Sequence, residues 1–534
     1  MKLRLSRGDV AFIVFIGVAL VGLLFGLGLL PFGRQPRSQP TVTPTSNPIV
    51  RENALPGTSD WQIPKDKGAT TQIQAYASAT SALPGQKLTF YVSTQIEGTR
   101  YAISIYRLGW YNGLGGRLML SQANLAGHSQ GYWYFQEPNS RLVGCNSCHV
   151  DRKTGLVEAN WQPSYTLTVP LDWTTGVYLA KFVDAYGFQT YAPFDLRGDS
   201  HSLYIAVTSD TTYAAYNDWG GYSLYRAYAS PEIGGRGVKV SFDRPYTHGN
   251  GSGFVFDFEI VTIRWLEREG YDVSYMSSVD LHKDPSQLLQ HRAYLSLGHD
   301  EYWTKEMRDG VERARDAGVG LAFLGANASY WQIRFEPDSA GTPDRTIVCY
   351  KVITGYHDLA RDPLYGKDNT RVTAQWRDPV LNRPENALIG IMFSSNTDSQ
   401  RILGFPWQVN PTAKSPLLDG TGLQLGQQYG CDLVGYEWDR IFNNGATPAD
   451  LKILGISHTM NENNTPDISN TTYYIAPSGA MVFATGSIYW TTVLDSYRPS
   501  TDTLCAGRDP VVPGIQKLMA NVMDALVIAH PLNG

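Results

Sequence analysis

The stretch Ala293-Tyr294-Leu295-Ser296-Leu297-Gly298-His299-Asp300-Glu301-Tyr302-Trp303 connects an apolar run to a cluster of ionisable side chains. The apolar run predicts a strand, and Thr304, directly after the stretch, can cap a helix whose apolar residues repeat at helical spacing. The cluster therefore lies at a strand-to-helix turn. In open α/β sheets, turns at the carboxyl ends of strands are where ligands bind. Acidic residues ahead of a helix also act as caps, but capping does not explain His299, so we expect a functional site here.

The chain from Ser209 onward alternates strand-like runs with longer helical periods, which indicates an α/β domain over residues 209–534. Gly318 to Asn327 is expected to be the next buried strand after the opening stretch, and a closing helix is expected near Ile515 to Ile528. Asn327 thus falls at a strand end, like His299 and Glu301. The expected architecture of this domain is layered, amidotransferase-like or flavodoxin-like.

Residues 67–208 show a different pattern, with short alternating runs separated by Gly, Pro and Asn. Lys87 to Ser93 and Tyr101 to Tyr106 are examples, and Leu203 to Val207 is expected to be the last strand of this set. The pattern predicts a β-sandwich domain. The body of the chain is therefore predicted to be α+β and multidomain, with a β-sandwich followed by an α/β domain.

The N-terminus predicts a membrane anchor. Basic residues at positions 2, 4 and 7 precede an uncharged run from Val10 to Phe32, which is long enough to cross a bilayer as a helix and is not followed by a small-x-small cleavage site. Residues 1–34 are thus expected to be a cytoplasmic basic end plus a transmembrane anchor, and residues 35–66 a Pro/Ser/Thr-rich linker. We expect a single-pass cell-membrane protein with an extracytoplasmic body.

Composition excludes one class of partner. The 534 residues are 43% hydrophobic and carry a net charge of -5, which is ordinary for globular domains and gives no electrostatic case for nucleic-acid binding. Because the body is expected outside the cell, its five cysteines predict at least one disulfide.

Cys145-Asn146-Ser147-Cys148-His149 has the spacing of a c-type haem attachment site. The surrounding residues indicate a loop between strands, with no helices to enclose a haem. A local disulfide or a surface metal clip is the simpler interpretation of Cys145 and Cys148, and haem electron transfer through them and His149 is a minor alternative.

The residue types at the turn limit the chemistry of the expected site. No cysteine lies there, which disfavours a thiol nucleophile, and the 10 histidines of the chain are mostly scattered, which disfavours zinc. Carboxylate, phenolate and imidazole groups remain. Hard oxygen donors of this kind suit a hard ion such as ferric iron.

Four segments of the chain resemble the large (beta) subunit of N,N-dimethylformamidase and its relatives. They are Ala215 to Gly221, Ser296 to Trp303, Gly325 to Trp331 and Gly435 to Asp439. The likeness extends from about Gln72 to the C-terminus. It implies a mononuclear ferric ion (Fe3+) held by two tyrosines and one glutamate.

By this resemblance, Glu301 is the glutamate ligand of the iron, and Tyr178 and Tyr216 are the tyrosine ligands, with Tyr222 as the rival for the second tyrosine. Tyr178 would make the sandwich domain part of the site. The resemblance implies that the catalytic residues around the ion are His299, Asn327 and Glu437.

The implied function is iron-assisted hydrolysis of an amide C–N bond in a small amide substrate. The predicted anchor favours an amide other than dimethylformamide, met outside the cell. The family is known with a small partner subunit, whose identity the sequence does not give, and a homo-oligomer is compatible with the chain. A non-catalytic surface binding protein is the alternative. Geometry discriminates the two, because the oxygens of Tyr178, Tyr216 and Glu301 must converge if they share an ion.

Overall fold

The computed structural model describes residues 47–137, 139–198, 201–227, 235–355, 362–397, 404–497 and 511–528. The predicted transmembrane anchor and residues 35–46 of the predicted linker lie outside these ranges. Within them, no helix is long and apolar enough to cross a membrane. The longest of these helices has 16 residues, whereas a span needs about 20. The described residues therefore do not support the transmembrane anchor in the predicted fold or the predicted single-pass cell-membrane protein, and both predictions are corrected to that extent.

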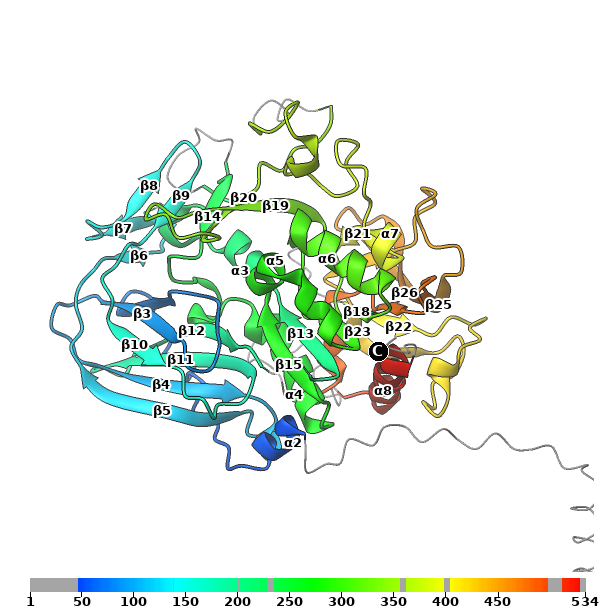
Figure 1. Cartoon of the computed structure of the whole chain (residues 1–534), viewed down its shortest axis with the longest axis horizontal. Helices are drawn as coiled ribbons and strands as arrows, with labels where there is room; N and C mark the ends of the chain where they lie inside the picture. Colours follow the sequence, from blue (N-terminus) through cyan, green and yellow to red (C-terminus); the bar gives the residue numbers. More distant parts are fainter. Residues whose placement is uncertain are drawn as a thin grey trace, which may run out of the picture. The chain divides into compact units, whose positions relative to one another are not determined.

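A β-sandwich forms the first part of the described chain (Figure 1). Its strands are β1 (Ile73–Ala77), β2 (Ser81–Ala82), β3 (Lys87–Thr94), β4 (Tyr101–Leu108), β5 (Gly116–Leu125), β10 (Tyr165–Thr168), β11 (Gly176–Asp184) and β12 (Gln189–Leu196). They form two sheets, with the orders β1-β3-β10 and β2-β12-β11-β4-β5. Neighbouring side chains of a strand point to opposite faces, so alternate apolar residues such as Phe90 and Phe182 meet in the core between the sheets.

A seven-stranded sheet forms the centre of the second part. Its strands are β13 (Tyr204–Thr208), β15 (Val273–Ser277), β16 (Ala293–Ser296), β18 (Gly320–Phe323), β25 (Lys452–Met460), β26 (Pro466–Ile475) and β27 (Met481–Ala484). Their order is β15-β13-β16-β18-β27-β26-β25. The strands from β15 to β27 pair in parallel, whereas β26 pairs antiparallel with both of its neighbours, β27 and β25. The carboxyl ends of β13, β16 and β18 therefore meet at one edge of the sheet.

The prediction that Leu203 to Val207 ends the sandwich is wrong. The strand β13 instead pairs in parallel with β15 on one side and β16 on the other. All five of its residues are buried, as in a parallel strand that is covered on both faces. A short apolar run has no periodicity that could distinguish this position from a sandwich strand.

Helices cover both faces of the central sheet (Figure 1). On one face lie α4 (Ile260–Arg268) and α8 (Pro513–Ile528), and on the other lie α5 (Ser278–Lys283), α6 (Lys305–Asp316) and α7 (Asn386–Ile389). This follows from alternation along the strands, since Leu295 belongs to the first core and Tyr294 to the second. Two further helices are α2 (Pro48–Asn53), ahead of the sandwich, and α3 (Asp210–Tyr216), directly after β13.

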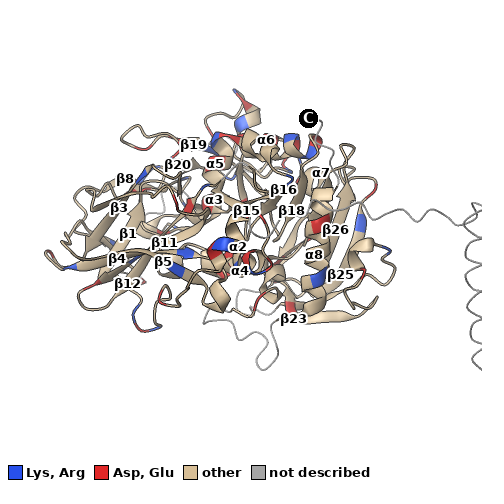
Figure 2. Cartoon of the chain, turned by 60° about the horizontal axis from the view of Figure 1, so that its bottom comes forward, with Lys and Arg blue, Asp and Glu red and all other residues tan. Residues whose placement is uncertain are grey.

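Smaller sheets complete the described residues. They are β6 (Tyr132–Tyr134) with β7 (Arg141–Val143), β8 (His149–Asp151) with β9 (Leu156–Glu158), β21 (Met392–Asn396) with β24 (Glu437–Arg440), β22 (Phe405–Gln408) with β23 (Gln428–Val434), and a sheet of β14 (Lys239–Ser241), β20 (Thr346–Val348), β19 (Trp331–Glu336) and β17 (Tyr302–Thr304). Strands therefore dominate over helices in the part of the chain that is described. Basic and acidic residues are interspersed along these elements, for example on α6 (Figure 2).

A buried ion pair joins the sandwich to the central sheet. Arg107 on β4 donates two hydrogen bonds to Glu267 on α4, from Nη1 to Oε2 and from Nη2 to Oε1, both at 2.8 Å. Both side chains are 0% exposed. The guanidinium also donates to the carbonyl oxygens of Thr175 and Leu108, so this buried charge is paired and hydrogen-bonded on several sides.

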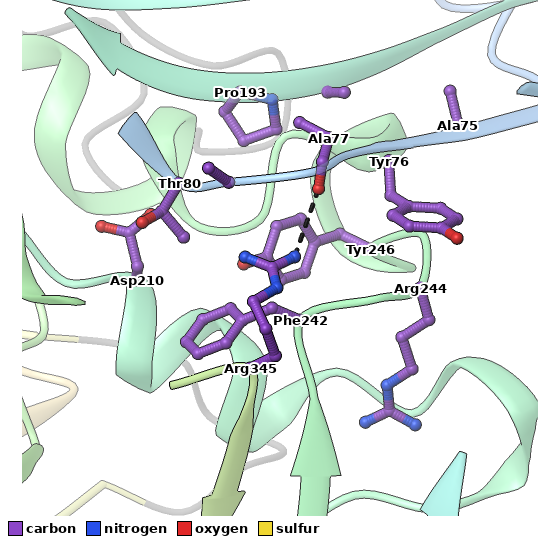
Figure 3. A pocket seen from close by; sticks show the side chains of 12 residues that line it. Ala75, Tyr76, Ala77, Thr80, Pro193, Asp210, Phe242, Arg244, Tyr246 and Arg345 are labelled. Atoms are coloured by element: carbon purple, nitrogen blue, oxygen red, sulfur yellow. Dashed lines mark hydrogen bonds between the residues drawn. The ribbon is translucent and has the colours of Figure 1, made fainter. Parts of the chain in front are cut away.

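A small cavity lies at the same interface (Figure 3). Its volume of about 20 Å³ has room for one water molecule. Arg345 extends across it and donates to the carbonyl oxygen of Ala77 at 3.3 Å. Asp210, which lines the cavity, and Asp195 lie 2.7 and 2.6 Å from Thr208 Oγ1. A hydroxyl has one proton to donate, so one of the two carboxyls must carry another. Burial raises the pKa of Asp195 well above its usual value and that of Asp210 to about 7, so both carboxyls hold protons more tightly than in water.

Candidate active site

The turn between β16 and α6 carries the charged cluster. Gly298 adopts a φ of +62°, and a Cβ atom added there would lie 2.9 Å from Glu259 Cγ, so the tight turn requires glycine. Thr304 then caps α6 by accepting a hydrogen bond from Met307 N at 3.2 Å. The predicted strand, turn and capped helix are confirmed at these residues. The turn holds His299 and Glu301 in the interior, at 1% and 2% exposed.

Two tyrosines converge on the carboxylate of Glu301. Tyr216 Oη, at the end of α3, donates to Glu301 Oε2 at 2.8 Å. Tyr225 Oη donates to Oε1 at 2.8 Å and lies 3.0 Å from Oε2. The rings of Tyr216 and Tyr225 stack with their centroids 4.2 Å apart, and Tyr302 Oη donates to Tyr225 Oη at 2.6 Å. Tyr225 is 38% exposed as a whole residue, but its phenol group lies in the interior, where burial raises its pKa well above the usual value.

His299 lies between two glutamates. Its Nε2 is 3.3 Å from Glu301 Oε2 and 3.9 Å from Glu437 Oε2. Burial alone would lower the pKa of His299, but the charges of Glu437 and Glu301 and a hydrogen bond to Glu301 raise it to about 9. Burial raises the pKa of Glu437 to about 7, although His299 opposes this. An imidazolium thus faces a carboxyl that can exchange a proton near neutral pH.

Asn327 holds Glu437 from the end of the next strand. It follows β18 with a φ of +56°, and its Nδ2 donates to Glu437 Oε2 at 3.0 Å. Its backbone N–H donates to Asp439 Oδ1 at 2.8 Å, which fixes the turn. The side-chain oxygen Oδ1 is buried and has no hydrogen-bond partner among the described residues. This oxygen is an acceptor that a bound molecule could satisfy.

A lysine lies beside the tyrosines. Lys351 Nζ is 3.3 Å from the centroid of the Tyr225 ring and 5.1 Å from that of Trp331. Burial lowers the pKa of Lys351 to about 8, while the charge of Glu301 acts in the opposite direction. The ammonium therefore places a positive charge next to a phenol and a carboxylate.

Of the residues predicted from sequence, the structure brings Tyr216, His299, Glu301, Asn327 and Glu437 together. It does not bring Tyr178 to them. Tyr178 packs in the sandwich core, where its ring stacks on Trp173 and Phe194 and its hydroxyl donates to the carbonyl oxygen of Thr174 at 2.6 Å. The placement of Tyr178 in the site is therefore corrected, because an inward tyrosine of a sandwich strand is a core residue here.

Tyr222, the rival ligand, lies in a different apolar cluster, with Trp133 and Trp219. Sequence reasoning missed Tyr225 and Lys351. Tyr225 follows Tyr222 in a tyrosine-rich stretch, and neither motif nor spacing singles it out. Lys351 follows the end of β20, so its only signal was a position just after a strand.

The cysteines follow the simpler interpretation. Cys145 and Cys148 form a disulfide, which confirms a local disulfide in the Cys-x-x-Cys-His segment. Thiols that are oxidised to a disulfide cannot form thioether bonds to haem. Cys431 is disulfide-bonded as well, and Cys349 is a buried free thiol.

The expectation of a metal-binding group needs a correction. Throughout the described ranges, no group of three or more His, Cys, Asp and Glu side chains is arranged to hold a metal ion. The cluster around Glu301 differs in composition from such groups, because two phenols and one carboxylate meet there.

Comparison with known proteins identifies similar chains. Residues 102–503 match the family model described as "N,N-dimethylformamidase beta subunit-like, C-terminal". An N,N-dimethylformamidase beta subunit of Alcaligenes sp is 22% identical over 439 residues, which is 69% of this chain and 55% of the relative. One of Paracoccus aminophilus is 23% identical over 261 residues, 40% of this chain and 32% of the relative. The match thus spans about half of the first relative and about a third of the second.

Among solved structures, a Paenibacillus sp. cycloisomaltooligosaccharide glucanotransferase aligns over 77% of this chain and 68% of its own, at 9% identity. The TM-score of 0.15 is too low for any argument about fold or function.

Proposed function

Because the chain belongs to the N,N-dimethylformamidase beta subunit-like family, we propose that it hydrolyses the C–N bond of an amide at the cluster around Glu301. The observation that carries this proposal is the convergence of Tyr216 and Tyr225 on Glu301, beside the His299–Glu437 pair. Such a set combines a place for an electrophile with a proton donor and a proton acceptor.

The family resemblance implies a ferric ion, and the donor set fits one. The phenol oxygens of Tyr216 and Tyr225 lie 2.8 to 3.0 Å from the oxygens of Glu301, so these hard donors face a common region. In this proposal, Tyr225 takes the ligand role that the family resemblance gives to Tyr178. When bound, the ion would polarise the amide carbonyl and lower the pKa of water.

The residues of the chain supply the proton transfers. Glu437 takes a proton from the water molecule as its oxygen adds to the carbonyl carbon. As the C–N bond breaks, the His299 imidazolium donates its proton to the departing nitrogen, which leaves as an amine. Glu437, whose Oε2 is 3.9 Å from His299 Nε2, then returns the proton taken from water to the neutral imidazole. The products are a carboxylic acid and an amine, so the atoms of one water molecule are divided between them.

Asn327 orients the reactants. Its Nδ2 donates to Glu437, and its buried Oδ1 has no hydrogen-bond partner among the described residues. An amide N–H of the substrate would satisfy this oxygen and align the carbonyl with the glutamate. The curated relatives are named as beta subunits, and we infer that this chain also works with a further subunit.

The test uses the purified full chain and compares Glu301→Gln, Tyr225→Phe and Tyr222→Phe. We expect bound iron and a tyrosinate-to-iron absorption band in the unmodified chain, loss of both in Glu301→Gln, and a changed band in Tyr225→Phe. Tyr222→Phe is the matched control, because it removes the same hydroxyl three positions away and should leave the band unchanged. Equal iron content in all variants would refute the ligand assignment.

Catalysis is tested separately, with amine release from a panel of formamides and acetamides. Glu437→Gln should keep the iron, because the residue is not in the donor set, and should lower kcat by about 10²–10⁴-fold, the usual contribution of a general base. Unchanged kcat in Glu437→Gln, or no hydrolysis of any amide by the iron-loaded chain purified together with its further subunit, would overturn the proposed reaction.

A further inference from the structure

Residues 217–224, which we call the tyrosine loop, connect the two tyrosines of the candidate active site. The tyrosine loop begins directly after Tyr216, the last residue of α3, and ends directly before Tyr225. Leu224 N donates to the carbonyl oxygen of Ala215 at 2.9 Å, so the two ends of the loop lie side by side. The position of one phenol relative to the other therefore depends on how this loop is folded.

One buried side chain binds the tyrosine loop at three positions. Arg244 Nη1 donates to the carbonyl oxygens of Trp219 at 2.6 Å and Tyr222 at 3.0 Å. Its Nη2 donates to the carbonyl oxygen of Asn217 at 2.7 Å, and the residue is 1% exposed. A guanidinium presents its N–H groups in a rigid planar fork. The three carbonyl groups are therefore held in a fixed arrangement around Arg244.

The tyrosine loop is also bound to the sandwich, through Gln74 on β1. Gln74 Oε1 accepts hydrogen bonds from Trp219 Nε1 at 2.9 Å and from Trp133 N at 3.0 Å. Its Nε2 donates to the carbonyl oxygens of Thr70 at 2.7 Å and Trp133 at 3.1 Å. Trp219 is thus held through its carbonyl oxygen by Arg244 and through its indole by Gln74.

The charge of Arg244 is stabilised by these contacts with the loop. Burial lowers the pKa of Arg244 to about 10, although the charge of Asp218 opposes this, so the guanidinium stays charged near neutral pH. A charge taken out of water costs free energy unless hydrogen bonds or an opposite charge compensate. The bonds to the tyrosine loop supply such compensation. Without Arg244, three carbonyl groups of buried residues would lose their donors, and the loop should loosen.

The folding of the loop decides which tyrosine reaches Glu301. Tyr222, whose carbonyl oxygen binds Arg244, is 1% exposed and packs in the apolar cluster of Trp219. Tyr225, three residues later, places its hydroxyl 2.8 Å from Glu301 Oε1. The bond from Arg244 thus holds Tyr222 in the apolar cluster, while Tyr225 meets the carboxylate.

We infer that Arg244 is a positioning residue, which sets the geometry of the Tyr216 and Tyr225 phenols through the loop between them. The inference rests on the proposed function, in which both phenols hold a ferric ion together with Glu301. Arg244 acts through the backbone of the tyrosine loop and not on the reacting atoms. Loss of a residue that orients metal ligands typically lowers metal affinity by about 10–100-fold.

The experiment compares Arg244→Met, Arg244→Lys and Arg345→Met in the full chain. Arg345→Met is the matched control, because Arg345 is also buried, at 6% exposed, but donates to Asp243 and to the carbonyl oxygen of Ala77. Each iron-free chain is titrated with ferric citrate while the tyrosinate-to-iron absorption band and the thermal midpoint are measured. We expect Arg244→Met to weaken iron binding by about 10–100-fold and to shift the band.

The other variants separate positioning from stability. Arg244→Lys should recover part of the affinity, because an ammonium can donate to some of the same carbonyl groups. Arg345→Met should lower the thermal midpoint and leave the iron affinity and the band unchanged. Iron binding that is unchanged in Arg244→Met, or equally weakened in Arg345→Met, would overturn the inference. If Arg244→Met does not fold, Arg244→Lys decides, and an affinity and band equal to those of the unmodified chain would overturn it.

Hydrogen exchange supplies a measurement that needs no iron. The Leu224 amide, which bonds to Ala215, should exchange at least tenfold faster in Arg244→Met than in the unmodified chain or in Arg345→Met. If the unmodified chain binds no iron, the proposed function fails, and faster exchange in Arg244→Met alone would still support the control of the tyrosine loop by Arg244. Equal exchange in all three chains would overturn the inference, whatever the result for iron.

Discussion

Replacement of Glu267 by Gln should destabilise the protein strongly, because it leaves the Arg107 charge buried at the sandwich–sheet interface. The pair makes two charge-assisted hydrogen bonds of 2.8 Å with both side chains 0% exposed. Each such bond contributes about 1.5–3 kcal/mol, and loss of one partner of a buried pair costs about 3–5 kcal/mol. We expect Glu267→Gln to lower the free energy of unfolding by the second amount, measured by urea denaturation at pH 7.

Two further variants make this prediction refutable. Glu269→Gln, two residues along the same segment, removes a glutamate that is 43% exposed and paired with Arg268, and should cost less than about 1 kcal/mol. The double variant Arg107→Met/Glu267→Gln removes both charges and should be more stable than Glu267→Gln alone, although the carbonyl oxygen of Thr175 loses its donor. A double variant as unstable as the single one would show that lost packing, and not the unpaired charge, sets the cost.

Three more outcomes are expected. Asp210→Asn should stabilise the protein at pH 8 by at most about 4 kcal/mol and have little effect at pH 4. The reason is that the unfolded carboxyl ionises above its usual pKa of 3.8, while the folded carboxyl holds its proton until its pKa of about 7. Urea denaturation midpoints measured between pH 4 and pH 8 check this prediction. Gln74→Leu should lose about 1–3 kcal/mol of stability, measured by urea denaturation, since it leaves the indole N–H of Trp219 buried without an acceptor. Thr304→Ala should cost about 0.5–2 kcal/mol of stability by removing the cap of α6, and an unchanged thermal midpoint would contradict this.

The sequence predicts those parts of the fold whose structure is determined by interactions between neighbouring residues. The Thr304 cap and the helix α6 can be predicted from the sequence, because capping and helical periodicity depend on residues only a few positions apart. The sheet to which β13 belongs cannot be predicted in this way, because β13 pairs with β15 and β16, which lie far away in the sequence. A strand that is buried on both faces carries the same apolar run in either sheet.

The residues of the candidate site also differ in whether local sequence patterns predict them. His299, Glu301 and Asn327 were found because the ends of parallel strands meet at one edge of a sheet. The family resemblance places Tyr178 in the site, but the strand β11 turns that ring into the sandwich core. Tyr225 and Lys351 come from segments whose path is set by tertiary packing, so no period or cap in the sequence marks them.

The Gln74 amide also constrains how this chain can change in evolution. Both ends of the amide are occupied, the oxygen by two N–H donors and the nitrogen by two carbonyl groups. Glutamate would lose the donors, and an aliphatic residue would lose everything. Relatives should therefore exchange the residues at positions 74 and 219 together, as a covarying pair.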